Sequence, residues 1–240
     1  MERNQDTFVI VPAYNEAGVI TEVLTSLCAR FAHVVCVDDG STDGTADAAS
    51  ATEAVVVRHP FNLGAGAATQ TGFEYALHHP GIEYFVTFDA DGQHKVADAQ
   101  RMVEELRKGT VDIVLGSRFL GDSSTIPPVK RSLLRMATKF ENFTTGTQLT
   151  DAHIGLRAFS RRFIESIEIT MPDFAHASEL AILIGRSGMP YVEIPVTVEY
   201  TDYSRAKGQS MWNSINIIFD LFFNYFLGGK RNRKWPSRSF

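Results

Sequence analysis

The sequence predicts an α/β domain of three layers built around a mostly parallel sheet. Two observations lead to this prediction. Short apolar runs rich in β-branched residues alternate with helical patterns through the first half of the chain. Polar or glycine-containing segments directly follow three of those runs. Strands alternating with helices form parallel sheets covered on both faces, and such sheets bind ligands beyond the carboxyl ends of their strands.

The elements of the first half are short and closely spaced. Apolar runs predict buried strands, and helical periodicity or composition predicts the helices between them. The strands are expected at residues 8–11, 34–37, 54–57, 84–88 and 112–115. The helices are expected at residues 16–31, 43–51, 67–78 and 96–108.

The second half is less regular. Pro127-Pro128 interrupts the chain before a basic, amphipathic stretch at residues 130–143. No internal repeat or low-complexity linker is present, so we expect one main domain at residues 1–210 and an appendage at residues 211–240. Within the main domain, a strand is expected at 155–159, a helix near 178–186 and a strand at 191–198.

Composition restricts the class of protein. The chain has 240 residues, of which 44% are hydrophobic and 21% charged, as in ordinary globular proteins. Its formal net charge of −5 argues against a general nucleic-acid binder, which normally presents a basic face. Cys28 and Cys36 lack metal-ligand spacing and the density of a disulfide framework, so we expect a reducing compartment. No apolar run has the length of a signal peptide or membrane span, which predicts a cytosolic protein.

The appendage combines an apolar helix with a basic tail. Residues 211–227 leave a narrow polar stripe beside a wide apolar face, and as a helix they would span about 25 Å. A bilayer core is ~30 Å thick and Asp220 lies in the middle, so a helix lying in the membrane interface is expected. Residues 228–240 contain five basic residues and no acidic one, which favours anionic headgroups. The alternative is a helix packed on the domain or on a second subunit.

Two carboxylates follow the fourth predicted strand. Asp89 and Asp91 are separated by one residue, so both can converge on one cation, and carboxylate oxygens suit Mg²⁺ or Mn²⁺. Such an ion bridges to substrate phosphates and neutralises charge on a departing diphosphate. Gly92 permits a turn that returns Gln93 and His94 towards the ion. The alternative is a solvated turn with no ligand.

Two further motifs follow predicted strands. After the second strand, Asp39 is expected to hydrogen-bond a base or ribose, and residues 41–43 to cap the next helix. After the first strand, Pro12 forms a rigid turn that presents the ring of Tyr14 and the carboxylate of Glu16, which suits a nucleoside. Ordinary packing is the alternative for Tyr14.

A glycine-containing segment at residues 62–68 does not match a known phosphate loop. Thr69 stands where the dinucleotide-binding fingerprint has its third glycine, and no Gly-Lys-Ser/Thr follows. Close approach of a helix and its backbone to a ligand is the better explanation.

Together, these motifs resemble family 2 glycosyltransferases of the GT-A fold. The matching segments are VPAYNE (11–16), VDDGSTDGT (37–45), NLGAGAA (62–68), FDADGQH (88–94) and GSRF (116–119). TDAHIGLRAF (150–159) and VEIPVTVEYTDYSRAKGQS (192–210) extend the resemblance over about residues 7–210, towards dolichyl- and polyprenyl-phosphate sugar transferases. The resemblance implies a Rossmann-like three-layer sandwich, a nucleotide-sugar donor and a divalent metal.

The resemblance also implies roles for individual residues. The metal would be held by Asp89, Asp91 and Gln93. Donor contacts are implied for Pro12, Ala13, Tyr14, Glu16, Val37, Asp38, Asp39, Gly64, Asp89, Ala90, Arg205, Lys207 and Ser210, with Arg205 closing over the phosphates.

Catalytic or acceptor-side roles are implied for Asp91, Arg118, Arg131, Asp151 and Glu179. The two arginines would bind an acceptor phosphate, and a surface charge is their alternative. For Asp151 and Glu179 the alternative is structural, through pairing with Arg157 or helix capping.

Two positions depart from the family pattern. Ala65 stands between the glycines where many relatives have Lys, and Met211 replaces a Lys that dolichyl-phosphate mannose enzymes often have. Both changes weaken any transfer of donor or acceptor identity from that subfamily. Apart from His94, the histidines 59, 78, 79, 153 and 176 lack ligand spacing and are expected at the surface or in the core.

These features predict inverting transfer of a hexose by one displacement at the anomeric carbon. A lipid phosphate is already an anion near neutral pH and needs arginines more than a general base. The chain has such arginines but no obvious acidic pair where hydroxyl-transferring relatives carry their base, so polyprenyl (undecaprenyl or dolichyl) phosphate is the expected acceptor.

Three alternatives remain. The acceptor is a saccharide hydroxyl with Asp151 or Glu179 as base, or the chain is an inactive nucleotide-sugar-binding scaffold that recruits a membrane partner. A nucleotidyltransferase shares the sheet architecture, but the sequence lacks a basic glycine-rich loop for a triphosphate. UDP- and GDP-linked donors both stay open, with UDP slightly favoured. We expect a peripheral protein on the cytoplasmic face of the membrane; the sequence leaves open a small integral membrane partner and a homo-oligomer.

Overall fold

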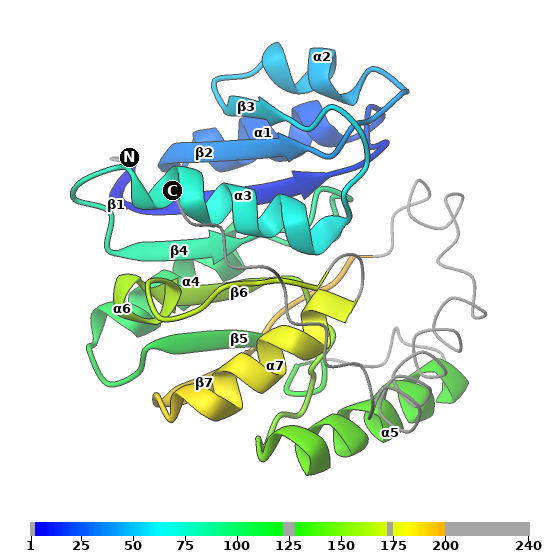
Figure 1. Cartoon of the computed structure of the whole chain (residues 1–240), viewed down its shortest axis with the longest axis vertical. Coiled ribbons are helices and arrows are strands. Elements are labelled where there is room, and N and C mark those ends of the chain that lie inside the picture. The colour runs from blue at the N-terminus through cyan, green and yellow to red at the C-terminus, as the bar shows by residue number, and fades with distance from the viewer. Residues whose placement is uncertain (1–2, 122–127, 172–174, 200–240) are drawn as a thin grey trace, which may run out of the picture.

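A computed structural model of the chain describes residues 3–121, 128–171 and 175–199. Its centre is one sheet of seven strands in the order β3-β2-β1-β4-β6-β5-β7 (Figure 1). All neighbouring pairs are parallel except those of β6, which runs antiparallel to both β4 and β5. The strands are β1 (Asn4–Ala13), β2 (Phe31–Asp38), β3 (Val55–Arg58), β4 (Tyr84–Thr87), β5 (Ile113–Ser117), β6 (Arg157–Ser160) and β7 (Tyr191–Pro195).

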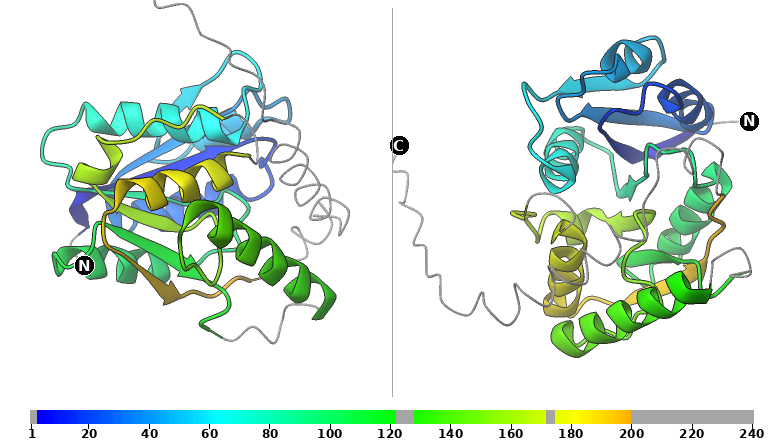
Figure 2. Two further views of the ribbon diagram at one scale, coloured as in Figure 1. Left: turned by 60° about the horizontal axis from the view of Figure 1, so that its bottom comes forward. Right: turned by 90° about the vertical axis from the view of Figure 1, so that its right-hand side faces the viewer.

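Helices cover both faces of the sheet, which confirms the predicted three-layer fold (Figure 2). Side chains of α1, α2 and α4 join one core, and those of α3, α6 and α7 join the other. The helices are α1 (Ile20–Cys28), α2 (Thr45–Ser50), α3 (Ala65–Leu77), α4 (Val96–Arg107), α5 (Pro128–Thr145), α6 (Arg161–Ile164) and α7 (Ala175–Ser187).

The central strand β1 shows why its sequence is continuously apolar. Phe8 and Ile10 belong to one core, while Val9 and Val11 belong to the other, and all four are buried. Successive side chains of a strand point to opposite faces, so a strand covered on both sides needs apolar residues at every position.

The predicted elements are present, with shifted boundaries and one addition. The helix expected at residues 16–31 begins only at Ile20, because Asn15 adopts a left-handed conformation (φ 56°) and the carbonyl of Glu16 closes a turn with Val19. The short helix α6 was not predicted. Within the described residues, none of the helices has the length and apolar character needed to cross a bilayer. The predicted interfacial helix and basic tail lie outside the described residues.

The packing of α3 on β1 generates a stability prediction. A Cβ at Gly72 would lie 2.2 Å from Cγ2 of Ile10, so Gly72→Ala forces α3 away from the sheet. We expect a loss of about 1–3 kcal/mol in the free energy of unfolding, despite the better helix propensity of alanine. Urea unfolding measures it, with the exposed Glu74→Ala on the same helix as a control that should change by less than about 0.5 kcal/mol. Equal effects of the two substitutions would contradict the packing argument.

Candidate active site

The loops that follow β1 and β2 are held together by hydrogen bonds. The N–H of Thr42 donates to the side-chain oxygen of Asn15 at 3.0 Å, and the N–H of Asn15 donates to the hydroxyl of Ser41 at 2.9 Å. The N–H of Glu16 donates to the hydroxyl of Thr45 at 2.8 Å. These bonds gather the two predicted nucleoside-binding segments at the carboxyl edge of the sheet.

The prediction that residues 41–43 cap the next helix holds only for Asp43. The cap position of α2 is Gly44 (φ 91°), which has no side chain to offer. Asp43 accepts from the N–H of Thr45 at 3.0 Å and from the N–H of Ala17 at 3.1 Å. The side chain of Ser41 and the backbone N–H of Thr42 bond to the β1 loop, so these two residues join the loops rather than cap the helix.

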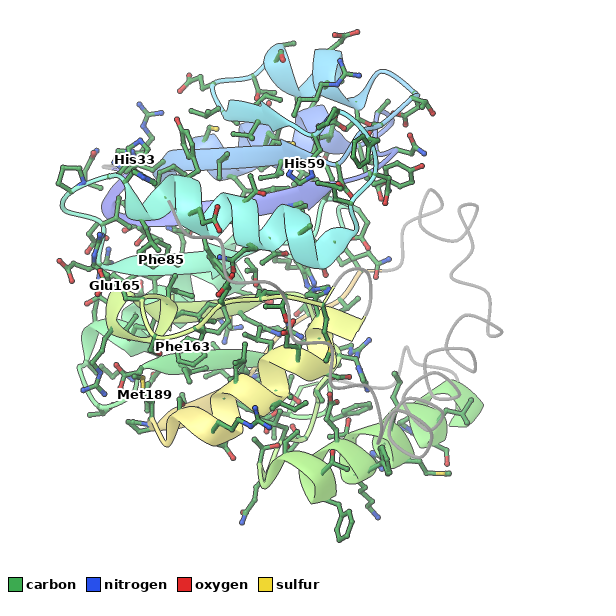
Figure 3. All side chains as sticks on the ribbon, viewed as in Figure 1. His33, His59, Phe85, Phe163, Glu165 and Met189 are labelled. Atoms are coloured by element: carbon green, nitrogen blue, oxygen red, sulfur yellow. The ribbon has the colours of Figure 1, made fainter. Side chains whose placement is uncertain are left out.

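Asp39 is buried, and protein groups bond to both of its oxygens. Oδ1 accepts from the N–H of Leu63 at 2.9 Å and lies 2.7 Å from Nδ1 of His59, while Oδ2 accepts from the N–H of Gly64 at 2.8 Å. The other ring nitrogen of His59 lies 3.0 Å from the hydroxyl of Thr71. In Figure 3, His59 lies at the opposite end of the strands from His33, which lies in β2 near its start. Asp39 therefore anchors the segment before α3, and its contact with a base or ribose stays a prediction.

A cavity of about 470 Å³ opens beside this anchor, a size typical of small-molecule sites. Nε of Arg58 lies 3.2 Å from Oδ2 of the buried Asp38, which fixes the guanidinium at the cavity wall. The wall consists of Gly40, Ser41, Thr42, Arg58, His59 and Pro60. The cavity is our candidate for the nucleoside site.

Asp89 and Asp91 follow β4 and are held differently. Oδ2 of Asp89 lies 2.9 Å from Nε2 of His94, and Oδ1 of Asp91 accepts from the backbone N–H of Gln93 at 3.0 Å. The Asp89 side chain is 44% exposed. Gly155 lies so close to it that a Cβ there would be 1.9 Å from Oδ1 of Asp89. The position of the Asp89 carboxylate therefore depends on a glycine at residue 155.

The two carboxylates differ in acidity. Burial raises the pKa of Asp91 to about 6, and the charges of Asp89 and Glu16 add to the rise. Partial burial acts in the same direction on Asp89, but the hydrogen bond from His94 and the charge of Arg157 outweigh it and hold the pKa of Asp89 below its usual value. A cation between the two carboxylates would relieve their repulsion.

The residues present fit a divalent cation. Asp89 and Asp91 supply oxygen ligands of the kind that Mg²⁺ and Mn²⁺ prefer. Gly155 has no side chain, which leaves room for the Asp89 carboxylate. Among the described residues, no cluster of three or more His, Cys, Asp or Glu side chains is placed to hold a metal. A Mg²⁺-type site needs only one or two carboxylates, which water and substrate phosphates complete. Gln93 contacts Asp91 through its backbone, and a role of its side chain at the ion stays a prediction.

Arg118 and Asp151 form a bidentate ion pair. Nε and Nη2 of Arg118 donate to the Asp151 carboxylate at 2.6 and 2.7 Å, and the backbone N–H of Arg118 donates to it at 3.1 Å. Burial disfavours the ionised form of Asp151 and so tends to raise its pKa. The charge and hydrogen bonds of Arg118 have the larger effect and hold the pKa of Asp151 below its usual range. Glu193 of β7 accepts from the N–H groups of Thr150 and Asp151, which fixes this loop in turn. The ion-pair partner of Asp151 is thus Arg118, not Arg157.

The remaining predicted acceptor-side residues are dispersed. The carboxylate of Glu179 accepts from the N–H groups of Thr170 and Met171, so it holds the chain before α7. Arg131 lies in the first turn of α5 and is half-buried. The predicted donor residues Arg205, Lys207 and Ser210 lie outside the described residues.

A buried polar group links α5 to the loop after it. Glu141 is 2% exposed, and neither of its oxygens has a hydrogen-bond partner among the described residues. Oε2 of Glu141 lies 3.5 Å from Nε2 of His153. Burial raises the pKa of Glu141 to about 7, against the weaker opposing charge of Arg157, and burial lowers the pKa of His153 to about 4.

Comparison with known protein families identifies the family of the chain. The family model described as glycosyl transferase family 2 matches residues 8–168, which include the motifs after β1, β2 and β4. The chain belongs to glycosyl transferase family 2. The resemblance predicted from the sequence is therefore confirmed.

Its curated relatives include enzymes that use polyprenyl phosphates. An uncharacterized protein of Methanocaldococcus jannaschii is 35% identical over 92% of this chain and 93% of its own length. A UDP-N-acetylglucosamine–dolichyl-phosphate N-acetylglucosaminyltransferase of Methanococcus voltae is 28% identical over 89% and 94%, respectively. A polyprenol monophosphomannose synthase of Mycolicibacterium smegmatis is 31% identical over 91% and 85%. The family 2 chain thus resembles polyprenyl-phosphate sugar transferases over nearly its whole length.

Solved structures share the fold. Glucosyl-3-phosphoglycerate synthase from Mycobacterium tuberculosis, crystallised with Mn²⁺, UDP-glucose and phosphoglyceric acid, superposes with a TM-score of 0.65 at 18% identity. The match covers 96% of this chain and 82% of that structure. At this identity the likeness supports the architecture of the family 2 chain and nothing finer.

Sequence reasoning missed several residues around this family 2 site. His59 was expected to be an ordinary surface or core residue, yet it contacts Asp39. β3 runs parallel to β2 with Arg58 opposite Asp38, which places the next residue beside Asp39, and this register is a property of the fold and not of the local sequence. Gly155 and Glu193 gave no local signal either, because their contacts depend on β6 and β7 reaching the same edge.

The raised pKa of Glu141 predicts a pH-dependent stability. Between pH 4.5 and 7 the folded protein holds a proton on Glu141 that the unfolded chain releases, so this group makes the fold less stable as pH rises. Wild type loses stability as pH rises through this range, and Glu141→Gln does not. The difference in unfolding free energy between Glu141→Gln and wild type should therefore increase by about 2 kcal/mol from pH 5 to pH 8. Urea unfolding of both proteins at the two pH values measures it, with Glu165→Gln as an exposed control. If the unfolding free energies of wild type and Glu141→Gln changed equally with pH, the raised pKa of Glu141 would be contradicted.

Proposed function

We propose that this enzyme transfers a hexose from a UDP- or GDP-linked donor to a polyprenyl phosphate at a membrane surface, with inversion at the anomeric carbon. The observation that carries the proposal is the Asp89–Asp91 pair at the carboxyl edge of the sheet, which also carries, beyond β2 and β3, a cavity of about 470 Å³. The names of the dolichyl-phosphate and polyprenol relatives support the choice of acceptor.

Asp89 and Asp91 would hold Mg²⁺ or Mn²⁺ together with the donor diphosphate. The bound ion would neutralise the charge that builds on the diphosphate as it leaves. The distant structural relative was itself crystallised with Mn²⁺ and UDP-glucose. His94 and Arg157 keep Asp89 ionised, while Asp91 is half-protonated near pH 6 and would ionise fully above it.

The state of Asp151 favours a phosphate acceptor over a hydroxyl acceptor. A general base needs a carboxylate that is free to take a proton, whereas Asp151 is engaged by Arg118 and its pKa is lowered. Glu179 is similarly engaged by backbone N–H groups. A phosphate monoester needs no base, because it is largely dianionic at neutral pH. Transfer to a saccharide hydroxyl is therefore the second candidate.

In the proposed step, an oxygen of the acceptor phosphate forms a bond to the anomeric carbon as the bond to the donor diphosphate breaks. The bonding electrons leave with the nucleoside diphosphate. Arg118, oriented by Asp151, and Arg131 would bind the acceptor phosphate, and Arg205 would close over the donor phosphates. The catalytic domain would extend to residue 210, and residues 211–240 would hold it at the cytoplasmic face of the membrane.

Substitution of Asp91 tests the reaction. We expect Asp91→Asn to reduce transfer of radiolabelled sugar into organic-extractable undecaprenyl phosphate by at least about 100-fold, with Mn²⁺ present. A panel of UDP- and GDP-sugars identifies the donor, and the exposed Asp47→Asn serves as the control. Metal-dependent donor turnover without a lipid product would move the acceptor to a saccharide. No turnover with any donor would favour a binding scaffold.

A double-mutant cycle tests the role of Asp151. If Asp151 only orients Arg118, both Arg118→Gln and Asp151→Asn raise KM for the lipid phosphate, and the double variant is no worse than Arg118→Gln alone. We expect a loss of about 30- to 1,000-fold in kcat/KM for Arg118→Gln. A general base would instead show a further large drop in kcat in the double variant and loss of the acidic, low-pH limb of its pH profile.

A further inference from the structure

Glu141 of α5 is a buried carboxylate that the packing of the helix does not require. It is 2% exposed, and neither of its oxygens has a hydrogen-bond partner among the described residues. The end of α5 is secured by its neighbour Asn142, whose side chain accepts from the N–H of Leu149 at 2.9 Å and donates to the carbonyl of Leu149 at 2.8 Å. A buried carboxylate without hydrogen bonds costs stability. Local structure therefore gives no reason for an acidic residue at this position.

His153 does not form an ion pair with Glu141 at physiological pH. Its Nε2 lies 3.5 Å from Oε2 of Glu141, but burial lowers the pKa of His153 to about 4, so the ring is neutral. Glu179 of α7, the helix that packs on α5, is engaged by backbone N–H groups of the preceding segment. Among the described residues, the positive charge that acts on Glu141 is that of Arg157.

Arg157 links this carboxylate to Asp89. The guanidinium is buried, and its Nη2 donates at 3.3 Å to the carbonyl of Ala152, the residue before His153. In the sheet, Arg157 lies opposite Thr87, two residues before Asp89. The charge of Arg157 favours the ionised form of both carboxylates. One buried guanidinium is therefore shared between the metal-binding candidate and the carboxylate of α5.

This sharing affects the charge available to a cation. Arg157 makes the candidate metal site less negative, which opposes the binding of a positive ion. A negative charge close to Arg157 reduces that effect. Asp151 also acts on Arg157, but both of its oxygens bond to Arg118, so the charges of that pair largely cancel. Glu141 contributes a negative charge without such compensation within the described part of the chain.

We propose that Glu141 is a positioning residue for the metal site, because its negative charge offsets that of Arg157 and leaves Asp89 and Asp91 free to hold a divalent cation. The inference rests on the metal site of the proposed function. It adds a residue of α5 that lies outside the loops after β1, β2 and β4. It also explains why a carboxylate occupies a position where it lowers the stability of the fold.

Binding of Mn²⁺ to the full chain, measured by electron paramagnetic resonance, tests the proposal without sugar transfer. We expect Glu141→Gln to weaken Mn²⁺ binding by about tenfold at pH 8, but by less than about twofold at pH 5.5, where Glu141 of wild type is protonated. Glu141→Asp keeps the charge and should bind within about threefold of wild type at pH 8. The exposed Glu165→Gln is the control for net charge. An equal loss at both pH values would indicate a structural effect and overturn the proposal, as would no loss at pH 8.

A measurement without metal separates failure of this inference from failure of the metal site. If the two carboxylates share Arg157, loss of the Asp89 charge leaves the guanidinium to Glu141. We expect Asp89→Asn to lower the pKa of Glu141 by about 0.5 to 1, as followed by ¹³C NMR of its carboxyl carbon, and Asp47→Asn to leave it unchanged. An unchanged pKa in Asp89→Asn would overturn the proposal. Absence of Mn²⁺ binding by wild type would overturn the metal site of the proposed function, and the pKa of Glu141 would still decide whether Arg157 is shared.

Discussion

Asp89 and Asp91 stand one residue apart at the end of β4, and the charge of Asp89 makes the proton of Asp91 harder to remove. Much of the surrounding structure responds to this crowding. His94 bonds to Asp89, Arg157 adds a positive charge nearby, and Gly155 leaves its carboxylate room. The negative charge is thus only partly compensated by the protein. A divalent cation, as in the proposed function, would complete the compensation.

The parallel sheet brings the rest of the site to this pair. β1 pairs with β2 on one side and with β4 on the other, so the loops after all three strands emerge at one edge. Hydrogen bonds between the first two loops and the anchoring of the segment before α3 by Asp39 then make that edge a connected surface. Residues far apart in the sequence thereby come to one edge of the sheet through strand register.

Fold class and the edge that carries the site follow from local sequence patterns. Continuous apolar runs such as residues 8–11 predict strands buried on both faces, and the motifs after them predict where ligands bind. The ion-pair and hydrogen-bond partners of individual carboxylates could not be predicted from these local patterns. Asp151 offered no local sign that it pairs with Arg118, because the pair depends on how the loop after β5 meets the loop before β6. Asp39 directly follows a predicted strand, which is where a ligand-binding residue is expected. Its hydrogen bonds from the N–H groups of Leu63 and Gly64 depend instead on tertiary contacts.

The antiparallel strand β6 fits between β4 and β5, although it follows both in the chain. During synthesis on the ribosome, β4 and β5 therefore emerge before the strand that joins them. Until β6 arrives, each has an edge without its final neighbour, and such edges are prone to pairing with other chains. Because Gly155 and Arg157 come with β6, a nascent chain that stops short of it has Asp89 without its final surroundings. Assembly of the edge that carries Asp89 thus coincides with closure of the sheet, and a truncated chain cannot acquire the candidate site early.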